Sequence, residues 1–183
     1  MRISSIEYKL GSKSETLADL GKHNPDWQIE RLLAKTGIAK RQVLASGETL
    51  LGLAEEACEK VFKENQREAI DGLLYVTQSP DSRIPTTACL LHERLKLSKH
   101  CLAFDVNQGC SGFVYALSLA VSLLRGCQVK QCLIVCAEAY SRYISLNDRT
   151  SRPIFSDGAS AAIVDMEGSG DIGPFVFATD GSG

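Results

Sequence analysis

The sequence predicts an α/β protein built on a mostly parallel, five-stranded mixed sheet with helices on both faces, in the order βαβαβαββ. Short segments of uncharged residues alternate along the chain with longer segments whose apolar residues recur at helical spacing. Strands that are apolar on both faces are typical of a parallel sheet that helices cover on both sides. The chain shows no internal repeat and no linker, so we expect one layered unit over residues 1–183.

Each expected element has a local signal in the sequence. Residues 3–10 alternate as a half-buried strand does, Pro25 suits the first turn of a helix over 25–35, and Thr49 suits the N-cap of a helix over 49–63. Two further helices are predicted over residues 86–95, after a proline-bracketed loop, and 113–124. The other predicted strands span residues 73–77, 102–104, 132–136, 159–166 and 175–178, with a flexible turn over 167–171 before the last.

The composition is that of an ordinary globular protein. Hydrophobic residues make up 44% of the 183 residues and charged residues 23%, which is enough apolar material for a full core. No run approaches the length of a membrane span, and the first residues lack the apolar core of a signal peptide. A net charge of −2 without a basic, aromatic-rich run argues against general nucleic-acid binding. We therefore expect a cytoplasmic protein.

The cysteines point to the same compartment. Seven is an odd number, and most of them lie inside apolar runs, which predicts reduced thiols in a core rather than a disulfide framework. The spacing of Cys127, Cys132 and Cys136 matches no common zinc pattern, so no metal is expected. The cysteines within apolar runs are Cys58, Cys89, Cys101, Cys132 and Cys136.

Cys110 differs from the other cysteines because it lies where a strand pattern turns into a helix pattern. Gly109 and Gly112 flank this turn and allow close approach of the backbone. A thiol in the first turn of a helix meets unpaired N–H groups and the positive end of the helix dipole, which favour a thiolate. Because the helix is apolar all round, we expect it to be buried and Cys110 to lie at the foot of a pocket. The alternative is a buried structural cysteine.

Four segments in order resemble motifs of the β-ketoacyl-acyl-carrier-protein synthase III family, within the thiolase-like condensing enzymes. The segment around Cys110 is similar to the active-site motif of that family. The other three are Thr36-Gly37-Ile38 with Lys40-Arg41, the loop and helix start from Ser79 to Cys89, and Asp148-Arg149 with Phe155 to Ala161.

The resemblance implies that this chain is the N-terminal half of a thiolase-like protein, with the second half beyond Gly183. It implies an acyltransferase of fatty acid and lipid biosynthesis, in which Cys110 takes an acyl group from acyl-coenzyme A before decarboxylative condensation with malonyl-acyl carrier protein. Its partners would be these two thioesters, with no cofactor and no membrane. It also implies a homodimer joined through the strand at 132–136, and a histidine and an asparagine supplied by the second half.

Binding residues follow from the same resemblance. Arg149 matches the arginine that stacks on the adenine of coenzyme A, whereas its aromatic partner position holds Arg31, with Trp27 four residues earlier. Ile84 matches a gate across the dimer interface, which implies an acyl group longer than acetyl. Tyr140 and Phe155 match positions that line the acyl pocket. Two basic groups become candidates for contacting phosphates: Lys35, Lys40 and Arg41, and Arg142, Arg149 and Arg152.

Two other functions remain open at this point. A truncated or non-catalytic homologue could keep the fold for dimerisation or binding alone. A cysteine hydrolase would need a general-base histidine near Cys110. The three histidines, His23, His92 and His100, lie in no recognisable partner motif, which disfavours the hydrolase.

Overall fold

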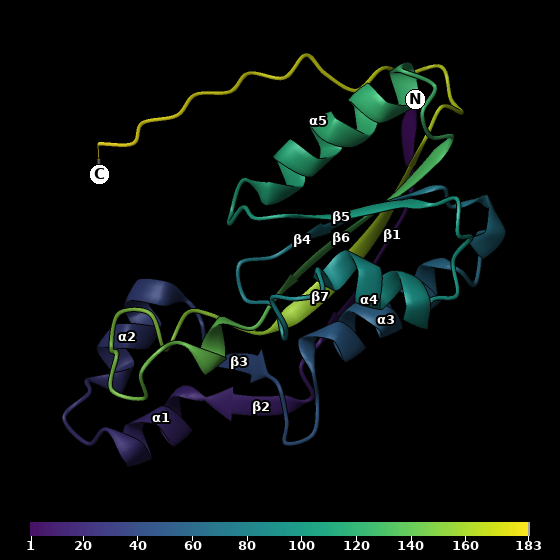
Figure 1. Cartoon of the computed structure of the whole chain (residues 1–183). Coiled ribbons are helices and arrows are strands. Elements are labelled where there is room, and N and C mark those ends of the chain that lie inside the picture. The colour runs from purple at the N-terminus through teal and green to yellow at the C-terminus, as the bar shows by residue number, and fades with distance from the viewer. Residues whose placement is uncertain (183) are drawn as a thin grey trace.

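The computed structural model describes residues 1–182, and its centre is a five-stranded mixed sheet in the strand order β1-β7-β6-β4-β5 (Figure 1). β4 pairs in parallel with both β5 and β6, while β7 runs antiparallel to β6 and β1. Four strands therefore share one direction and β7 opposes them, which confirms the mostly parallel mixed sheet. The strands are β1 (Arg2–Leu10), β4 (Gly72–Val76), β5 (Leu102–Val106), β6 (Gln131–Glu138) and β7 (Gly158–Asp165).

Helices cover both faces of this sheet, as the sequence predicts (Figure 1). α3 (Leu50–Val61) and α4 (Thr87–Arg94) lie on one face, and α5 (Gly112–Arg125) lies on the other. Thr49 caps α3, since its hydroxyl accepts a hydrogen bond from the Gly52 N–H at 3.0 Å. Each face has its own core, because alternate residues of β4 and β6 point to opposite sides. No helix within residues 1–182 is both long and apolar enough to cross a membrane.

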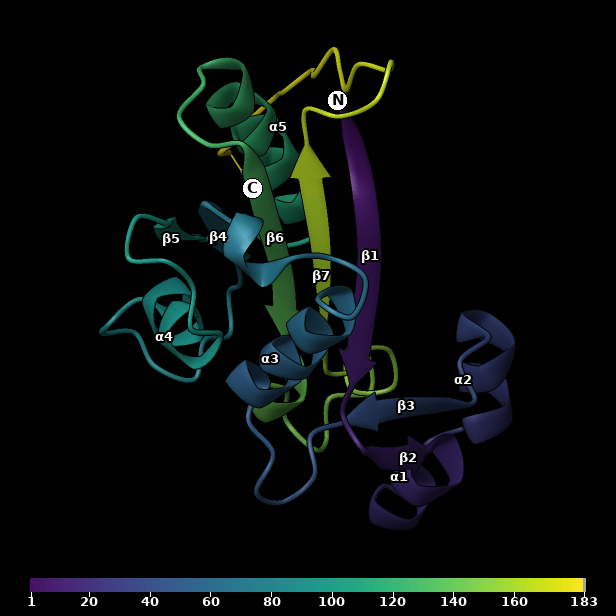
Figure 2. The same cartoon turned by 90° about the vertical axis from the view of Figure 1, so that its right-hand side faces the viewer.

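A second, two-stranded sheet was not predicted from the sequence. It pairs β2 (Lys13–Thr16) with β3 (Lys40–Val43) in antiparallel fashion and carries α1 (Leu17–His23) and α2 (Ile29–Thr36) beside it (Figure 2). These strands are four residues long and mostly polar, so their sequence has no apolar periodicity to detect. Two 3₁₀ turns complete the chain, η1 (Arg67–Ala69) and η2 (Tyr140–Arg142).

The predicted strand over residues 175–178 is wrong. This segment is extended but pairs with no strand, and it lies beside α5 (Figure 1). Aromatic contacts hold it there: the Phe177 ring lies 4.8 Å from the Tyr115 ring and 6.1 Å from the Phe175 ring. Val176 is 91% exposed. The alternation of apolar residues that suggests a strand therefore reflects one-sided packing on a helix.

The predicted dimer strand is also wrong. β6, which contains residues 132–136, lies inside the sheet and is hydrogen-bonded on one side to β4 and on the other to β7. A strand paired on both sides has no free edge to offer to a second subunit. The edge strands are β1 and β5.

Candidate active site

Cys110 lies in the turn between β5 and α5, at the end of the sheet where the parallel strands β4, β5 and β6 reach their carboxyl ends. Open α/β sheets bind ligands at this end. The Gly112 N–H donates to the Gly109 carbonyl at 2.8 Å and closes the turn around the cysteine. Cys110 is exposed and borders an open cavity, whereas the sequence predicts a thiol at the foot of a pocket below a buried helix. α5 is not covered all round either, since Val114 and Leu119 are exposed on its outer side.

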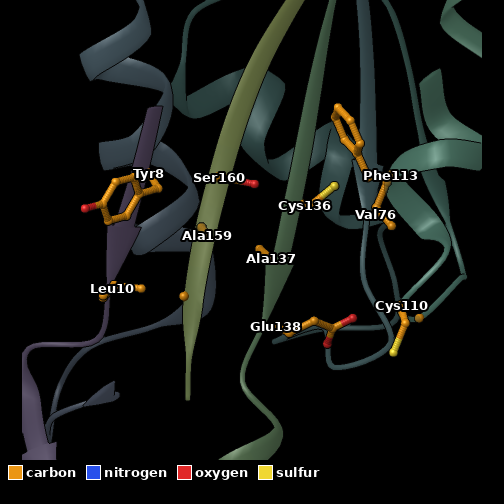
Figure 3. A pocket seen from close by; sticks show the side chains of 12 residues that line it. Tyr8, Leu10, Val76, Cys110, Phe113, Cys136, Ala137, Glu138, Ala159 and Ser160 are labelled. Atoms are coloured by element: carbon orange, nitrogen blue, oxygen red, sulfur yellow. The ribbon is translucent and has the colours of Figure 1, made fainter. Parts of the chain in front are cut away.

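Cys110 borders an open cavity of about 430 Å³ on the α5 face of the sheet (Figure 3). The strand register places two rows of residues across β1, β7 and β6 at its floor. One row is Tyr8, Ser160 and Cys136, and the next is Leu10, Gly158 and Glu138. Val76, Gly109, Phe113, Ala137 and Ala159 complete the lining. The walls are mainly apolar, with one carboxylate among them, as is typical of small-molecule sites.

Two glycines hold the Cys110 turn close to the end of β4. A Cβ added at Gly109 would lie 2.7 Å from Gln78 Oε1, and one added at Gly112 would overlap Val76 Cγ1. Real Cβ atoms do not approach other atoms this closely, so both positions require glycine unless the neighbour moves. The flanking glycines that the sequence shows are therefore explained by packing against Val76 and Gln78.

Polar contacts link the same end of β4 to β6. The Gln78 N–H donates to Glu138 Oε1 at 2.7 Å, and the Ser79 hydroxyl donates to Glu138 Oε2. Figure 3 shows the Glu138 carboxylate pointing toward the side of the cavity where Cys110 lies. Burial raises the pKa of the Glu138 carboxyl, although the hydrogen bonds that it accepts act in the opposite direction. The sequence offered no signal for this residue.

Tyr140 and Phe155 lie together beside the Cys110 turn. Their rings are 5.6 Å apart, and the Tyr140 hydroxyl donates to Gln78 Oε1 at 2.7 Å. Burial raises the pKa of Tyr140, with smaller contributions from Glu138 and Cys110, so the phenol is a neutral donor. Neither ring lines the Cys110 cavity. Ile84 lies outside it as well, 89% exposed in the loop before α4.

Arg149 lines a second, smaller cavity of about 150 Å³ together with residues of α2. Arg31 and Lys35 are in the same lining, so three cations meet there with no carboxylate among the lining residues. Trp27 is half-buried nearby in the sequence but is not part of this lining. The cavity brings together Arg149 and the position where the resemblance expects an aromatic partner, which is Arg31.

Three of the other arginines proposed to contact phosphates are engaged within the protein, which corrects that expectation. Arg41 is 2% exposed and binds Glu15, with a 2.8 Å bond from its Nε, and it also donates to the Phe155 carbonyl. Arg152 is buried and donates to the carbonyls of Ser141 and Ile144. Arg142 pairs with Asp81 at 2.5 Å and binds the Ser79 carbonyl.

Four of the cysteines are buried or half-buried, and the other three are exposed. Burial raises the pKa of Cys101 to about 11 and of Cys132 and Cys136 to about 12, and it raises that of Cys58 further. These thiols are therefore protonated at neutral pH and poor nucleophiles. Cys110, Cys89 and Cys127 are exposed. The prediction that Cys89 lies in the core is therefore wrong. All seven cysteines are unpaired.

The three histidines lie away from Cys110. His23 Nδ1 meets the Asp19 carbonyl in α1, and His92 Nε2 meets the Ser98 carbonyl beyond α4. His100 is exposed in the loop before β5. Within residues 1–182, no histidine lines the Cys110 cavity. The arrangement expected of a cysteine hydrolase is therefore not found among these residues.

The fold, with a cysteine in the turn before α5, is that of a thiolase-like α/β protein. The family model described as 3-oxoacyl-[acyl-carrier-protein] synthase III matches residues 104–181, which include Cys110, Tyr140, Arg149 and Phe155. Over this segment the chain is similar to that family.

Individual relatives show the same similarity in sequence. The β-ketoacyl-[acyl-carrier-protein] synthase III of Xylella fastidiosa is 40% identical over 165 residues, which is 89% of this chain and 50% of that protein. That of Rhizorhabdus wittichii is 39% identical over 150 residues, 81% of this chain and 46% of that protein. The chain spans about half the length of the curated relatives that it matches.

Solved structures show the same fold. A 3-oxoacyl-(acyl-carrier-protein) synthase III crystal structure superposes with a TM-score of 0.92 at 42% identity, over 98% of this chain and 54% of that one. The synthase III of Thermus thermophilus superposes with a TM-score of 0.86 at 32% identity, over 93% of this chain and 53% of that one.

Proposed function

We propose that this chain is the acyl-accepting half of a β-ketoacyl-acyl-carrier-protein synthase III, an acyltransferase of fatty acid biosynthesis. The observation that carries the proposal is the exposed Cys110 at the start of α5, beside an open apolar cavity, in a segment that matches this family. Its relatives are named as synthases of this reaction. We assign this chain to the N-terminal half of such an enzyme.

The chemistry requires a nucleophile that can both gain and lose an acyl group. The Cys110 thiolate attacks the thioester carbonyl of an acyl-coenzyme A, the carbon–sulfur bond to coenzyme A breaks, and the coenzyme leaves as its thiol. The main-chain N–H of Cys110 makes none of the hydrogen bonds found within residues 1–182, so it is available to the oxyanion. Malonyl-acyl carrier protein then loses carbon dioxide, the resulting carbanion attacks the acyl carbonyl, and the carbon–sulfur bond to Cys110 breaks, which returns the thiolate.

The binding residues have separate roles in this proposal. Arg149, Arg31 and Lys35 supply positive charge for the phosphates and adenine of coenzyme A, and the cavity they share supports this role. Trp27 is a weaker candidate for adenine stacking because it does not line that cavity. Tyr140 and Phe155 lie outside the Cys110 cavity, so in this proposal they contact the acyl group only near the thiol, beside Gln78. No cofactor takes part beyond the two thioester substrates.

We further propose a homodimer in the cytoplasm. β5 is an edge strand whose outer side carries no partner strand within residues 1–182, so it replaces β6 as the strand that joins two sheets. The exposed Ile84 supports an interface on this side, because α4, which follows it, packs against β5. There Ile84 would reach the acyl pocket of the partner and leave room for acyl groups longer than acetyl. The seven unpaired cysteines suit a reducing compartment.

Release of coenzyme A tests this function. The purified chain is mixed with hexanoyl-coenzyme A, and free coenzyme A is quantified by chromatography over time. We expect a burst approaching one equivalent per chain, and no burst in the Cys110→Ala variant. A burst that persists in Cys110→Ala would assign the chemistry to another group. No burst in the parent chain would contradict an acyl-accepting role.

A further inference from the structure

The Gln78 side chain lies directly against the turn that carries Cys110. Its Oε1 is 2.7 Å from the position of a Cβ on Gly109, the residue before the cysteine. Gln78 follows β4, and the Thr77 N–H still donates to the Val106 carbonyl of β5 at 3.2 Å, so the backbone here remains part of the sheet. The amide therefore reaches the turn from a rigid support.

Two contacts hold Gln78 in this place. The Tyr140 hydroxyl donates to Gln78 Oε1 at 2.7 Å, and the Gln78 N–H donates to Glu138 Oε1 at the same distance. Glu138 ends β6 and Tyr140 begins η2, so both partners come from the carboxyl end of the strand beside β4. Gln78 is exposed, so these two hydrogen bonds, and not burial, keep its side chain against Gly109.

We infer that Gln78, held by the Tyr140 hydroxyl, is a positioning residue that sets the orientation of the Cys110 thiol through Gly109. Val76 supports the other side of the turn, where it leaves no room for a side chain at Gly112. The cysteine is thus fixed between two contacts with the end of β4. The effect on thiol reactivity stands on geometry alone, whereas the effect on acyl transfer rests on the proposed function of Cys110.

The geometry makes a specific demand on paired substitutions. In Gly109→Ala the new methyl group meets Gln78 Oε1, so the turn must shift or the Tyr140 bond must break. Removing the amide with Gln78→Ala clears that contact. Gly112→Ala is the matched control, because its methyl group meets Val76 and Gln78→Ala leaves that overlap in place.

The experiment measures the alkylation rate of Cys110 by iodoacetamide in the full chain, with peptide mass spectrometry, and uses the exposed Cys89 and Cys127 as internal references. We expect Gly109→Ala to lower the Cys110 rate about tenfold, because a displaced thiol loses its helix-start environment. Gln78→Ala in that background should raise the Cys110 rate to that of Gln78→Ala alone, about a third of the parent rate. The same change should not restore Gly112→Ala. The inference would be overturned if Gln78→Ala did not raise the Cys110 rate of Gly109→Ala. It would also be overturned if Gln78→Ala raised the rates of Gly109→Ala and Gly112→Ala equally.

Single substitutions keep the inference testable if Gly109→Ala does not fold. Gln78→Ala and Tyr140→Phe should each lower the Cys110 rate about threefold while Cys89 and Cys127 keep theirs, and the double variant should be no slower than Gln78→Ala. The inference would be overturned if the two rate losses multiplied in the double variant. It would also be overturned if both single variants kept the parent rate. The same variants are assayed with hexanoyl-coenzyme A. If alkylation behaves as expected but no variant or parent releases coenzyme A, the proposed function fails while the positioning role stands.

Discussion

At the scale of single residues, the position of Cys110 was predictable and its surroundings were not. The strand-to-helix change and the flanking glycines are local signals, and they place Cys110 correctly in the turn before α5. Gln78 and Glu138 reach the same turn from β4 and β6, which are distant in sequence, and no local pattern marks them. The exposure of Cys110 was not predictable, because an apolar helix pattern does not show which sides of the helix other elements cover.

The first prediction is that Cys110 is alkylated before the other cysteines at pH 7.5. Cys58, Cys101, Cys132 and Cys136 are protonated there because burial raises their pKa values. Cys89 and Cys127 are exposed but lie away from the glycine-bounded turn. Limited iodoacetamide treatment followed by peptide mass spectrometry measures the order. Faster labelling of Cys127, or of Cys89 in the first turn of α4, would contradict this order.

The buried thiols also predict how stability depends on alkaline pH. Cys132 has a pKa of about 12 in the fold, against 9.0 when exposed. Above pH 9 the unfolded chain releases this proton and the folded chain keeps it, so the free energy of unfolding falls as pH rises toward 12. The loss between pH 8 and pH 10 should be about 1 kcal/mol for each such thiol.

Urea unfolding at the two pH values measures this loss. Cys132→Ala should reduce the difference between them, even though the variant is less stable at both. The exposed Cys127 offers the matched control, and Cys127→Ala should leave the difference unchanged. An identical pH dependence in the parent and Cys132→Ala would contradict the assignment.

At the scale of elements, apolar pattern and capping residues predicted α3, α4, α5 and the five strands of the main sheet. β2 and β3 were missed because a buried ion pair, and not an apolar stripe, holds them: Glu15 of β2 binds Arg41 of β3. The segment over 175–178 was misassigned because aromatic packing on α5 produces the alternation of a strand. The apolar pattern of the sequence therefore predicts elements that pack on a core, but it does not predict elements that an ion pair holds together.

The small sheet should depend on that buried ion pair. Arg41→Met leaves the Glu15 carboxylate largely buried beside a single, more distant partner, Arg152, at 3.7 Å. We expect a loss of about 3 kcal/mol in the free energy of unfolding, since removing one member of a buried pair strands the other charge. Lys40→Met, at the exposed neighbouring position, is the control and should change stability little. Urea unfolding of both variants measures this loss. An equal loss in Arg41→Met and Lys40→Met would contradict the structural role of Arg41.

At the scale of the whole molecule, the fold class was predictable but the order of the strands was not. The family resemblance implies that the strand at 132–136 joins two subunits, whereas β6 lies in the middle of the sheet and β5 at its edge. Register then brings β1, β7 and β6 together as the floor of the Cys110 cavity. These pairings are decided by packing of the complete sheet, and they determine which residues can meet a ligand or a second subunit.

The chain should self-associate through the β5 side. Light scattering at micromolar concentration should give at least a dimer, and Ile84→Asp should weaken it tenfold or more because a charge at an apolar contact must lose its water, at about 1.4 kcal/mol for each factor of ten. Val176→Asp provides the control, since Val176 is similarly exposed but lies on the segment beside α5. A monomer in the parent chain would contradict the dimer, and equal weakening by both variants would place the interface elsewhere.

The most direct test of the central claim is the location of an acyl group transferred from acyl-coenzyme A. The chain is incubated with hexanoyl-coenzyme A, digested at acidic pH to preserve thioesters, and analysed by peptide mass spectrometry. We predict one hexanoyl group per chain, on the peptide that contains Cys110, with Cys89 and Cys127 unmodified. Acylation spread over the exposed cysteines, or absent from Cys110, would contradict the identification of Cys110 as the acyl-accepting nucleophile.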